Sequence, residues 1–241
     1  MTKFNKLKKL IKSITSSDRK KNRKIKIIFA VTFIALLLKK KYEQVDTPLP
    51  ESNFNELFFE DYCGTKWNKS NITWSIVDDR LYLPKHPKGN YVDVINISNN
   101  LEKVKLIEKA FNLWDDALSS ITFSYTDNGN DADITVGIVK SNQISSDGRW
   151  NYIYNQNNNI TNSCIRVIDR NSEDWFLTTM LHEIGNVLGL GDIKPRKDIQ
   201  SIQEDPFPKK FPVSAESLWN FDVRMIKYLY GEPVEIPIFA A

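Results

Sequence analysis

The stretch HEIGNVLGLGD, residues 182–192, decides how the rest of this sequence is interpreted. A helix that carries His-Glu-x-x-His places two imidazoles on one face, where they can hold a metal ion, with a glutamate beside them as a general base. His182 and Glu183 match this pattern, but Asn186 stands where the second histidine would be. Gly189 can end the helix and let the chain turn back, so that Asp192 returns toward a metal held by His182.

The charge of the chain is divided between a basic N-terminal segment and an acidic remainder. Residues 1–41 hold 14 Lys and Arg and one acid, Asp18, which gives +13, whereas the rest holds 19 bases and 29 acids, which gives −10. The bases are gathered in a tail and are not spread over a folded face, so we expect no nucleic-acid partner.

An apolar run extends from Ile27 to Leu38 and is closed by the lysines at 39–41. As a helix it would span roughly 18 Å, which is short of a ~30 Å hydrocarbon core, but flanking lysines can snorkel and lengthen the span. No small-x-small cleavage pattern follows it, so we expect an uncleaved signal-anchor; a basic amphipathic or buried helix is the alternative. The body is then expected on the extracellular or lumenal side of a membrane, or secreted.

This interpretation divides the chain into a basic tail at 1–26, a signal-anchor at 27–38, a linker at 39–62 and a folded domain at 63–241. Apolar spacing predicts an α+β fold, in which a mixed twisted sheet is covered by helices. Strands are expected at 67–76, 121–125, 132–138 (central), 150–154 (an edge) and 164–168, helices at 100–118, 172–189 and 217–230 with Asn99 and Ser172 as the first two N-caps, and a loop at 77–97.

The chain resembles a matrixin, the matrix-metalloprotease branch of the metzincins, in segments that follow the family's order. The metzincin pattern His-Glu-x-x-His-x-x-Gly-x-x-His is matched at His182, Glu183, Gly189 and, with Asp for the last His, Asp192. The other matching segments are Lys66-Trp67 with Ile72–Ile76, Ala110–Trp114, Ile121–Phe123, Ala132–Ile134, and Leu218, Asp222, Ile226 and Leu229–Gly231. The fold implied has a long helix behind the sheet, an active-site helix and a C-terminal helix.

The resemblance implies a zinc metalloendopeptidase that hydrolyses peptide bonds. It assigns the zinc-ligand positions to His182, Asn186 and Asp192, and it makes Glu183 the catalytic residue that polarises the attacking water. It also implies a peptide or protein substrate, bound as an added strand near Val136.

Two departures from the family predict impaired zinc ligation. The carboxamide of Asn186 is a weak zinc ligand and is shorter than an imidazole, and Gln203 stands where the family has a methionine beneath the metal. The alternative function is therefore a catalytically inactive pseudoprotease that binds peptides or proteins. In a third interpretation, His182 is an ordinary helix histidine of an α+β domain. The other histidine of the chain, His86, is expected to lie exposed in a loop.

The chain has two cysteines, Cys63 and Cys164, which can form one disulfide or none. A bridge is expected only if the body lies outside the cytosol, and free thiols are the alternative.

Overall fold

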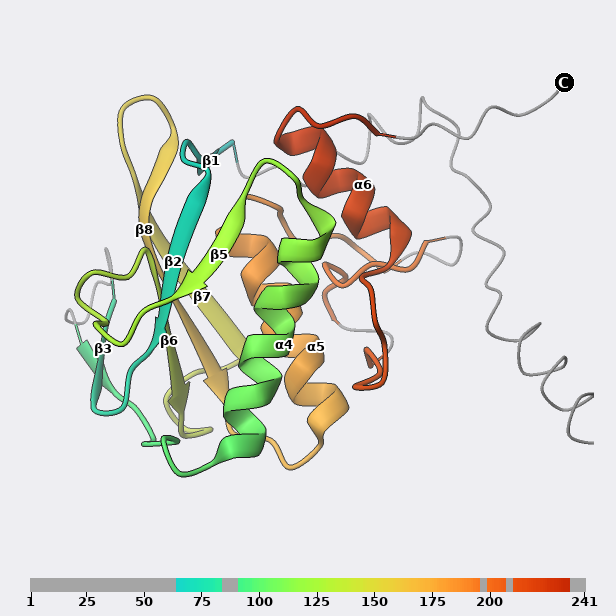
Figure 1. Cartoon of the computed structure of the whole chain (residues 1–241). Helices are drawn as coiled ribbons and strands as arrows, with labels where there is room; N and C mark the ends of the chain where they lie inside the picture. Colours follow the sequence, from blue (N-terminus) through green and yellow to red (C-terminus); the bar gives the residue numbers. More distant parts are fainter. Residues whose placement is uncertain (1–63, 84–90, 196–198, 207–209, 235–241) are drawn as a thin grey trace, which may run out of the picture. The chain divides into compact units, whose positions relative to one another are not determined.

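The computed structural model describes residues 64–83, 91–195, 199–206 and 210–234 (Figure 1). The chain divides into two compact units, Met1–Asp46 and Thr47–Ala241, and all described residues belong to the second. The expected tail, signal-anchor and linker, together with Cys63 and His86, lie outside the described residues, so what was expected of them stays a prediction. No helix within the described residues is long and apolar enough to cross a membrane.

A mixed sheet forms the framework of the domain (Figure 1). Along its main path all neighbours pair in parallel, in the order β1 (Lys66–Trp67), β8 (Asn159–Ile168), β6 (Ile134–Val139), β2 (Asn71–Ile76) and β5 (Thr122–Tyr125). A further strand, β7 (Gly148–Tyr154), pairs with β8 in antiparallel orientation. Together with the helices this sheet makes an α+β domain, which confirms the predicted fold class.

The helices of the described part are α4 (Leu101–Ala117), α5 (Glu173–Val187) and α6 (Asn220–Leu229). Figure 1 shows α4 and α5 side by side against the sheet, and the indole Nε1 of Trp114 on α4 donates a hydrogen bond to the Leu181 carbonyl on α5 at 3.0 Å. Trp114 and Phe111 are fully buried, and each stabilises the domain by roughly 3 kcal/mol through burial. All three helices were predicted. The expected cap Ser172 is confirmed, but Asn100, not Asn99, caps α4.

Two expectations for the N-terminal third of the domain are wrong. The first strand is interrupted and forms β1 and β2, and the segment expected to be a loop at 77–97 contains the antiparallel pair β3 (Arg80–Tyr82) and β4 (Tyr91–Asp93). Leu81 of β3 is fully buried in a small second cluster with Leu83 and Cys164. Strands of three residues are too short to be recognised from alternating apolar and polar residues. They become apparent only from the packing of Leu81 in the folded domain.

The edge of the sheet beside α5 is β7. Val136 is fully buried in β6, which lies between β8 and β2, so the prediction that a peptide adds to the sheet near Val136 is wrong. Among the described strands β7 pairs only with β8, which confirms the prediction of an edge strand at 150–154.

The C-terminal end of α5 is fixed by groups from both ends of the domain. The Trp67 indole donates to the Val187 carbonyl at 2.8 Å, and the Tyr230 hydroxyl donates to the Leu188 carbonyl at 2.8 Å. Gly189 then turns the chain back with a φ of +107°, at a point where an added Cβ would lie 2.1 Å from the Thr65 carbonyl oxygen. Only glycine fits there, and this turn brings Asp192 back toward α5.

We expect Gly189→Ala to lower the free energy of unfolding by roughly 3 kcal/mol, because a left-handed backbone strain of about 1–2 kcal/mol adds to an overpacking cost of about 1–3 kcal/mol. Gly231→Ala is the matched control, since Gly231 has a φ of +72° but open space around it, and it should show the strain alone. Urea unfolding of both variants measures the difference. An equal loss of unfolding free energy in the two variants would show that the contact with Thr65 does not restrict this turn.

Candidate functional site

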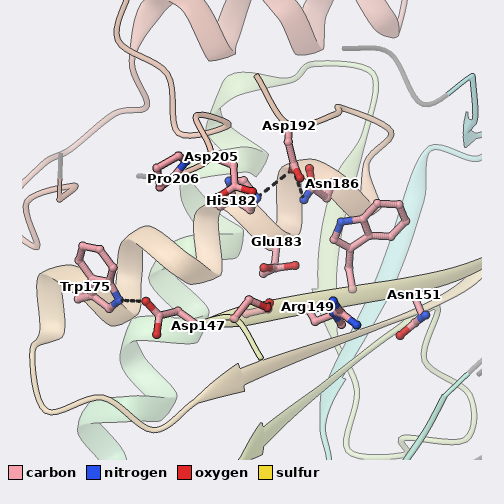
Figure 2. A pocket seen from close by; sticks show the side chains of 13 residues that line it. Asp147, Arg149, Asn151, Trp175, His182, Glu183, Asn186, Asp192, Asp205 and Pro206 are labelled. Carbon is pink, nitrogen blue, oxygen red and sulfur yellow. Dashed lines mark hydrogen bonds and ion pairs between the residues drawn. The ribbon is translucent and has the colours of Figure 1, made fainter. Parts of the chain in front are cut away.

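A cavity of about 590 Å³ lies between α5 and β7 (Figure 2). It contains all four residues predicted for the site: His182, Glu183, Asn186 and Asp192. The rest of its lining comes from β7 and the segment that leads into it, from the start of α5 and from the loop after α5, and consists of Ser146, Asp147, Gly148, Arg149, Trp150, Asn151, Trp175, Asp205 and Pro206.

Helix α5 is buried on every side from Phe176 to Val187. His182 is 5% exposed, Glu183 4% and Asn186 1%, because β7 and the segment around residues 201–204 cover the face that carries them. The polar side chains on this face are therefore shielded from bulk water and need specific hydrogen-bond partners.

His182 is held between two oxygen atoms. Its Nδ1 lies 2.9 Å from the Ile202 carbonyl oxygen, and its Nε2 lies 3.1 Å from Oδ1 of Asp192. A carbonyl and a carboxylate both accept hydrogen bonds, so the two contacts are satisfied together only by an imidazolium, which donates from both nitrogens. Burial would lower the pKa of His182, but the hydrogen bond to Asp192 and the charge of Glu183 raise it further than burial lowers it.

Asp192 joins His182 to Asn186. Its Oδ1 also accepts a hydrogen bond from Nδ2 of Asn186 at 3.0 Å, so it has two donors (Figure 2). The hydrogen bond from His182 is the main reason that the pKa of Asp192 is lowered. These three side chains are called the His182–Asn186–Asp192 cluster below.

The cluster does not offer the donors that a catalytic zinc site uses. Such sites take three ligands from His, Asp, Glu and Cys, whereas the third member here is a carboxamide. Across the described part of the chain, no group of three or more His, Cys, Asp and Glu side chains is placed to hold a metal ion. Asn186 also turns its nitrogen toward Asp192, and a carboxamide nitrogen is a hydrogen-bond donor with no acceptor capacity.

Gln203 lies beneath His182. Its Nε2 donates to the His182 carbonyl oxygen at 3.3 Å, and a Cβ on Gly185 would lie 2.1 Å from the same nitrogen. An amide thus packs directly on the helix backbone in the place where the resemblance predicts a methionine. The close approach requires a glycine at position 185.

Asp222 on α6 fixes the loop that carries Ile202 and Gln203. Its Oδ1 accepts hydrogen bonds from the Ser201 hydroxyl at 2.5 Å and from the Ile202 amide at 3.1 Å. The side chain is fully buried, and burial raises its pKa to about 7. Asp222 therefore sets the position of the Ile202 carbonyl that holds His182. The sequence had marked Asp222 only as part of the closing helix.

Glu183 points from α5 toward β7 (Figure 2). A Cβ on Gly148 would lie 2.4 Å from its Oε1, so the backbone of β7 passes directly beside the carboxyl group. Its Oε2 is buried and has no hydrogen-bond partner among the described residues. Burial is the largest cause that raises the pKa of Glu183 to about 8, against the opposing charges of His182, Arg166 and Arg149.

The sequence did not identify the wall opposite α5. Asp147 accepts a hydrogen bond from the Trp175 indole at 2.6 Å and forms an ion pair with Arg170, and Asp205 and Pro206 close another side of the cavity. No spacing pattern links these residues to the helix, so only the three-dimensional structure identifies them.

No protein-family model and no curated protein matches the chain significantly. One similar solved structure is the GM1-bound form of the ECX AB5 holotoxin, with 16% identity, a TM-score of 0.33, and coverage of 72% of this chain and 78% of that one. Another is Myroilysin, a metalloprotease, with 19% identity and a TM-score of 0.30. That match covers 52% of this chain and 44% of the other, so the chain spans less than half of Myroilysin. TM-scores this low do not establish a shared fold, and the matrixin resemblance rests on the residues of the chain itself.

The raised pKa of Glu183 predicts a pH-dependent loss of stability. The folded state holds a proton up to about pH 8, whereas an unfolded glutamate releases it near pH 4.3, so this group disfavours folding increasingly as the pH rises between these values. Glu183→Gln should remove this contribution, and its melting temperature should fall less than that of the unmodified chain between pH 5 and pH 8. Glu173→Gln, in the exposed first turn of α5, is the control. If the melting temperatures of all three proteins changed in the same way with pH, the raised pKa of Glu183 would be contradicted.

Proposed function

We propose that the chain is a matrixin-like protein that no longer cuts peptides and instead binds an extended segment of a peptide or protein in the cleft between α5 and β7. The observation that carries this proposal is the position of Asp192, whose Oδ1 accepts hydrogen bonds from both His182 and Asn186. Groups that would have to turn toward a metal in an active member of the family satisfy one another here.

The protonation of the cluster opposes metal binding. A metal ion takes a neutral imidazole, so it would have to displace the proton on Nε2 of His182 and break its contact with Asp192. It would also have to break the hydrogen bond from Asn186 and turn that amide around. In return it would gain a weak carboxamide ligand. Zinc, the cofactor that the resemblance implies, is therefore proposed to bind weakly or not at all.

The edge of β7 that pairs with no described strand supports peptide binding. The Asp147 carbonyl accepts a hydrogen bond from the Ile168 amide at 2.9 Å, and the register pairs Arg149 with Arg166. In an antiparallel ladder the backbone groups of alternate residues face the partner strand, so those of Gly148 and Trp150 face away from β8 and toward the edge. An extended peptide can pair with these groups as an added strand and lie along the cavity.

The second candidate is a zinc metalloendopeptidase with impaired ligation at Asn186. Glu183 favours it, because this carboxyl group stands in the cleft beside the β7 edge with a pKa of about 8. Such a value suits a group that takes up and releases a proton near neutral pH. The two candidates share the peptide-binding cleft and differ in whether zinc is bound and the bound peptide is hydrolysed.

The remaining expectations rest on sequence alone and are proposals in the same sense. They place this domain on the extracellular or lumenal side of a membrane, attached through residues 27–38, or in a secreted form, with peptides or proteins as partners and no nucleic acid.

Zinc binding and cleavage by the full chain separate the two candidates. We expect the unmodified chain to leave a quenched fluorescent peptide library uncut in the presence of zinc. Asn186→His should bind zinc at least ~100-fold more tightly, because an imidazole replaces a weak ligand. Competition with a chromophoric chelator measures the affinity.

Hydrolysis by the unmodified chain with one tightly bound zinc, abolished by Glu183→Ala, would establish the metalloendopeptidase instead. Asn112→His, on the exposed side of α4, is the control for zinc binding by an added surface histidine.

A further inference from the structure

Two buried oxygen atoms in the lining of the cavity lack hydrogen-bond partners among the described residues. They are Oε2 of Glu183 and Oδ1 of Asn186, which lie on successive turns of α5. The two side chains are 4% and 1% exposed. Buried polar atoms in folded proteins are nearly always hydrogen-bonded, so two such atoms in one cavity indicate that a partner outside the domain completes the site.

The missing partner has to be a donor. A carboxamide oxygen accepts hydrogen bonds, and the charge of a bound cation would lower the pKa of Glu183, so that this carboxyl group accepts hydrogen bonds as a carboxylate. No ion pair joins Glu183 to a described Lys or Arg. Asp192 and Asp205 add further carboxylates to the lining of the cavity. A cation with several N–H groups is the chemical group that this arrangement of acceptors fits.

Arg149 is in the lining as well, but it does not occupy the place of this cation. Successive residues of a strand point to opposite faces, so the Arg149 side chain leaves β7 on the face opposite to the one on which Gly148 meets Glu183. In the pairing of β7 with β8, Arg149 lies opposite Arg166, which also carries a guanidinium.

A peptide added to β7 would bring its own groups to Glu183. Gly148 lies beside that carboxyl group, and its amide faces the edge, where it can pair with an added strand, whereas its carbonyl already accepts a hydrogen bond from the Ser146 hydroxyl. Side chains of the added strand alternate between the two faces of the sheet, and every second one would point toward α5. The cavity of about 590 Å³ lies within the roughly 300–1,000 Å³ range of ligand pockets, so it has room for a long side chain.

We propose that the cleft recognises a primary ammonium group of the bound peptide, carried either by a lysine side chain or by the peptide N-terminus, and that Glu183 and Asn186 accept its hydrogen bonds. This inference rests on the proposed peptide-binding function and specifies the ligand. An ammonium group has three donors on one atom, which can reach the carboxylate and the carboxamide at the same time. Its charge compensates the buried carboxylate, for which the described residues provide no ion pair.

The test uses the full chain in the presence of a metal chelator and four short peptides. The pair acetyl-Ala-Ala-Lys-Ala-Ala-amide and acetyl-Ala-Ala-norleucine-Ala-Ala-amide differs only in the side-chain ammonium. The pair Ala-Ala-Ala-Ala-Ala-amide and its acetylated form differs only in the terminal ammonium. We expect at least one ammonium peptide to bind about tenfold more tightly than its neutral partner, as a charge-assisted hydrogen bond provides. Titration followed by the fluorescence of the cleft residues Trp150 and Trp175 measures the Kd.

Variants assign the preference to the two acceptors. Glu183→Gln should abolish it, whereas Glu173→Gln, an exposed position on the same helix, should keep it. Asn186→Ala should weaken binding of the ammonium peptide more than binding of its neutral partner, which provides a second test if Glu183→Gln does not fold. The pair that shows the preference identifies whether the ammonium comes from a side chain or from a terminus.

Equal Kd values within both pairs would overturn this inference and leave the peptide-binding function intact. A preference that persists in both Glu183→Gln and Asn186→Ala would also overturn it, because the ammonium would then be recognised elsewhere. If none of the four peptides binds, the proposed function and the inference both fail.

Discussion

The burial of α5 from Phe176 to Val187 means that every polar group on this stretch needs a hydrogen-bond partner other than bulk water. Thr178 meets this requirement by donating to the Asp174 carbonyl and accepting from the Phe211 amide, and Thr179 donates to the Trp175 carbonyl. The contact with Phe211 attaches the helix to the segment that precedes α6. The same requirement acts on the residues further along the helix, where the candidate site lies.

Three side chains on the second half of α5 meet this requirement to different degrees. His182 is satisfied on both nitrogens, Asn186 on its nitrogen only, and Glu183 has one oxygen without a described partner. A metal ion would be one way to satisfy all three at once, but the carboxamide makes it a poor one. In the proposed function, hydrogen bonds within the domain satisfy part of this site and a bound peptide satisfies the rest.

Parts of the chain that are far apart in sequence hold this site in place. Trp67 in the first strand and Tyr230 after α6 bind the end of α5, and Asp222 on α6 positions the loop that contacts His182. At the turn after α5, the Thr65 carbonyl leaves room only for a glycine at position 189. The geometry of the cluster is thus a property of the whole domain, since it depends on the strand at one end and the helix at the other.

Much of the fold could be predicted from the sequence, because its larger elements have regular apolar spacing. Ile107, Phe111 and Trp114 repeat at helical intervals and are fully buried in α4. The hairpin of β3 and β4 could not be predicted, because its strands are short and are defined by contact of Leu81 with a distant strand. The strand around Val136 was correctly predicted as central, and only its use as a binding edge was wrong.

The candidate site could be predicted only in part. The spacing of His182, Glu183 and Asn186 placed them together, and the glycine turn brought Asp192 back to them. Spacing does not indicate which atom of the Asn186 amide faces Asp192, nor that Asp222 holds the opposing loop, since both depend on tertiary contacts. The opposite wall, with Asp147 and Asp205, comes from loops that have no periodic pattern.

The protonation state of His182 is the most direct test of the proposed site, in which a protonated cluster does not bind zinc. The chain has two histidines, His86 and His182, so a His86→Gln variant has a single imidazole whose ¹⁵N signals can be assigned without ambiguity. We expect His182 to be mostly protonated on both nitrogens at pH 6.5, where an ordinary imidazole is about half protonated, and equimolar zinc to leave both signals unchanged. A neutral imidazole whose Nε2 signal shifts when zinc is added would contradict this expectation.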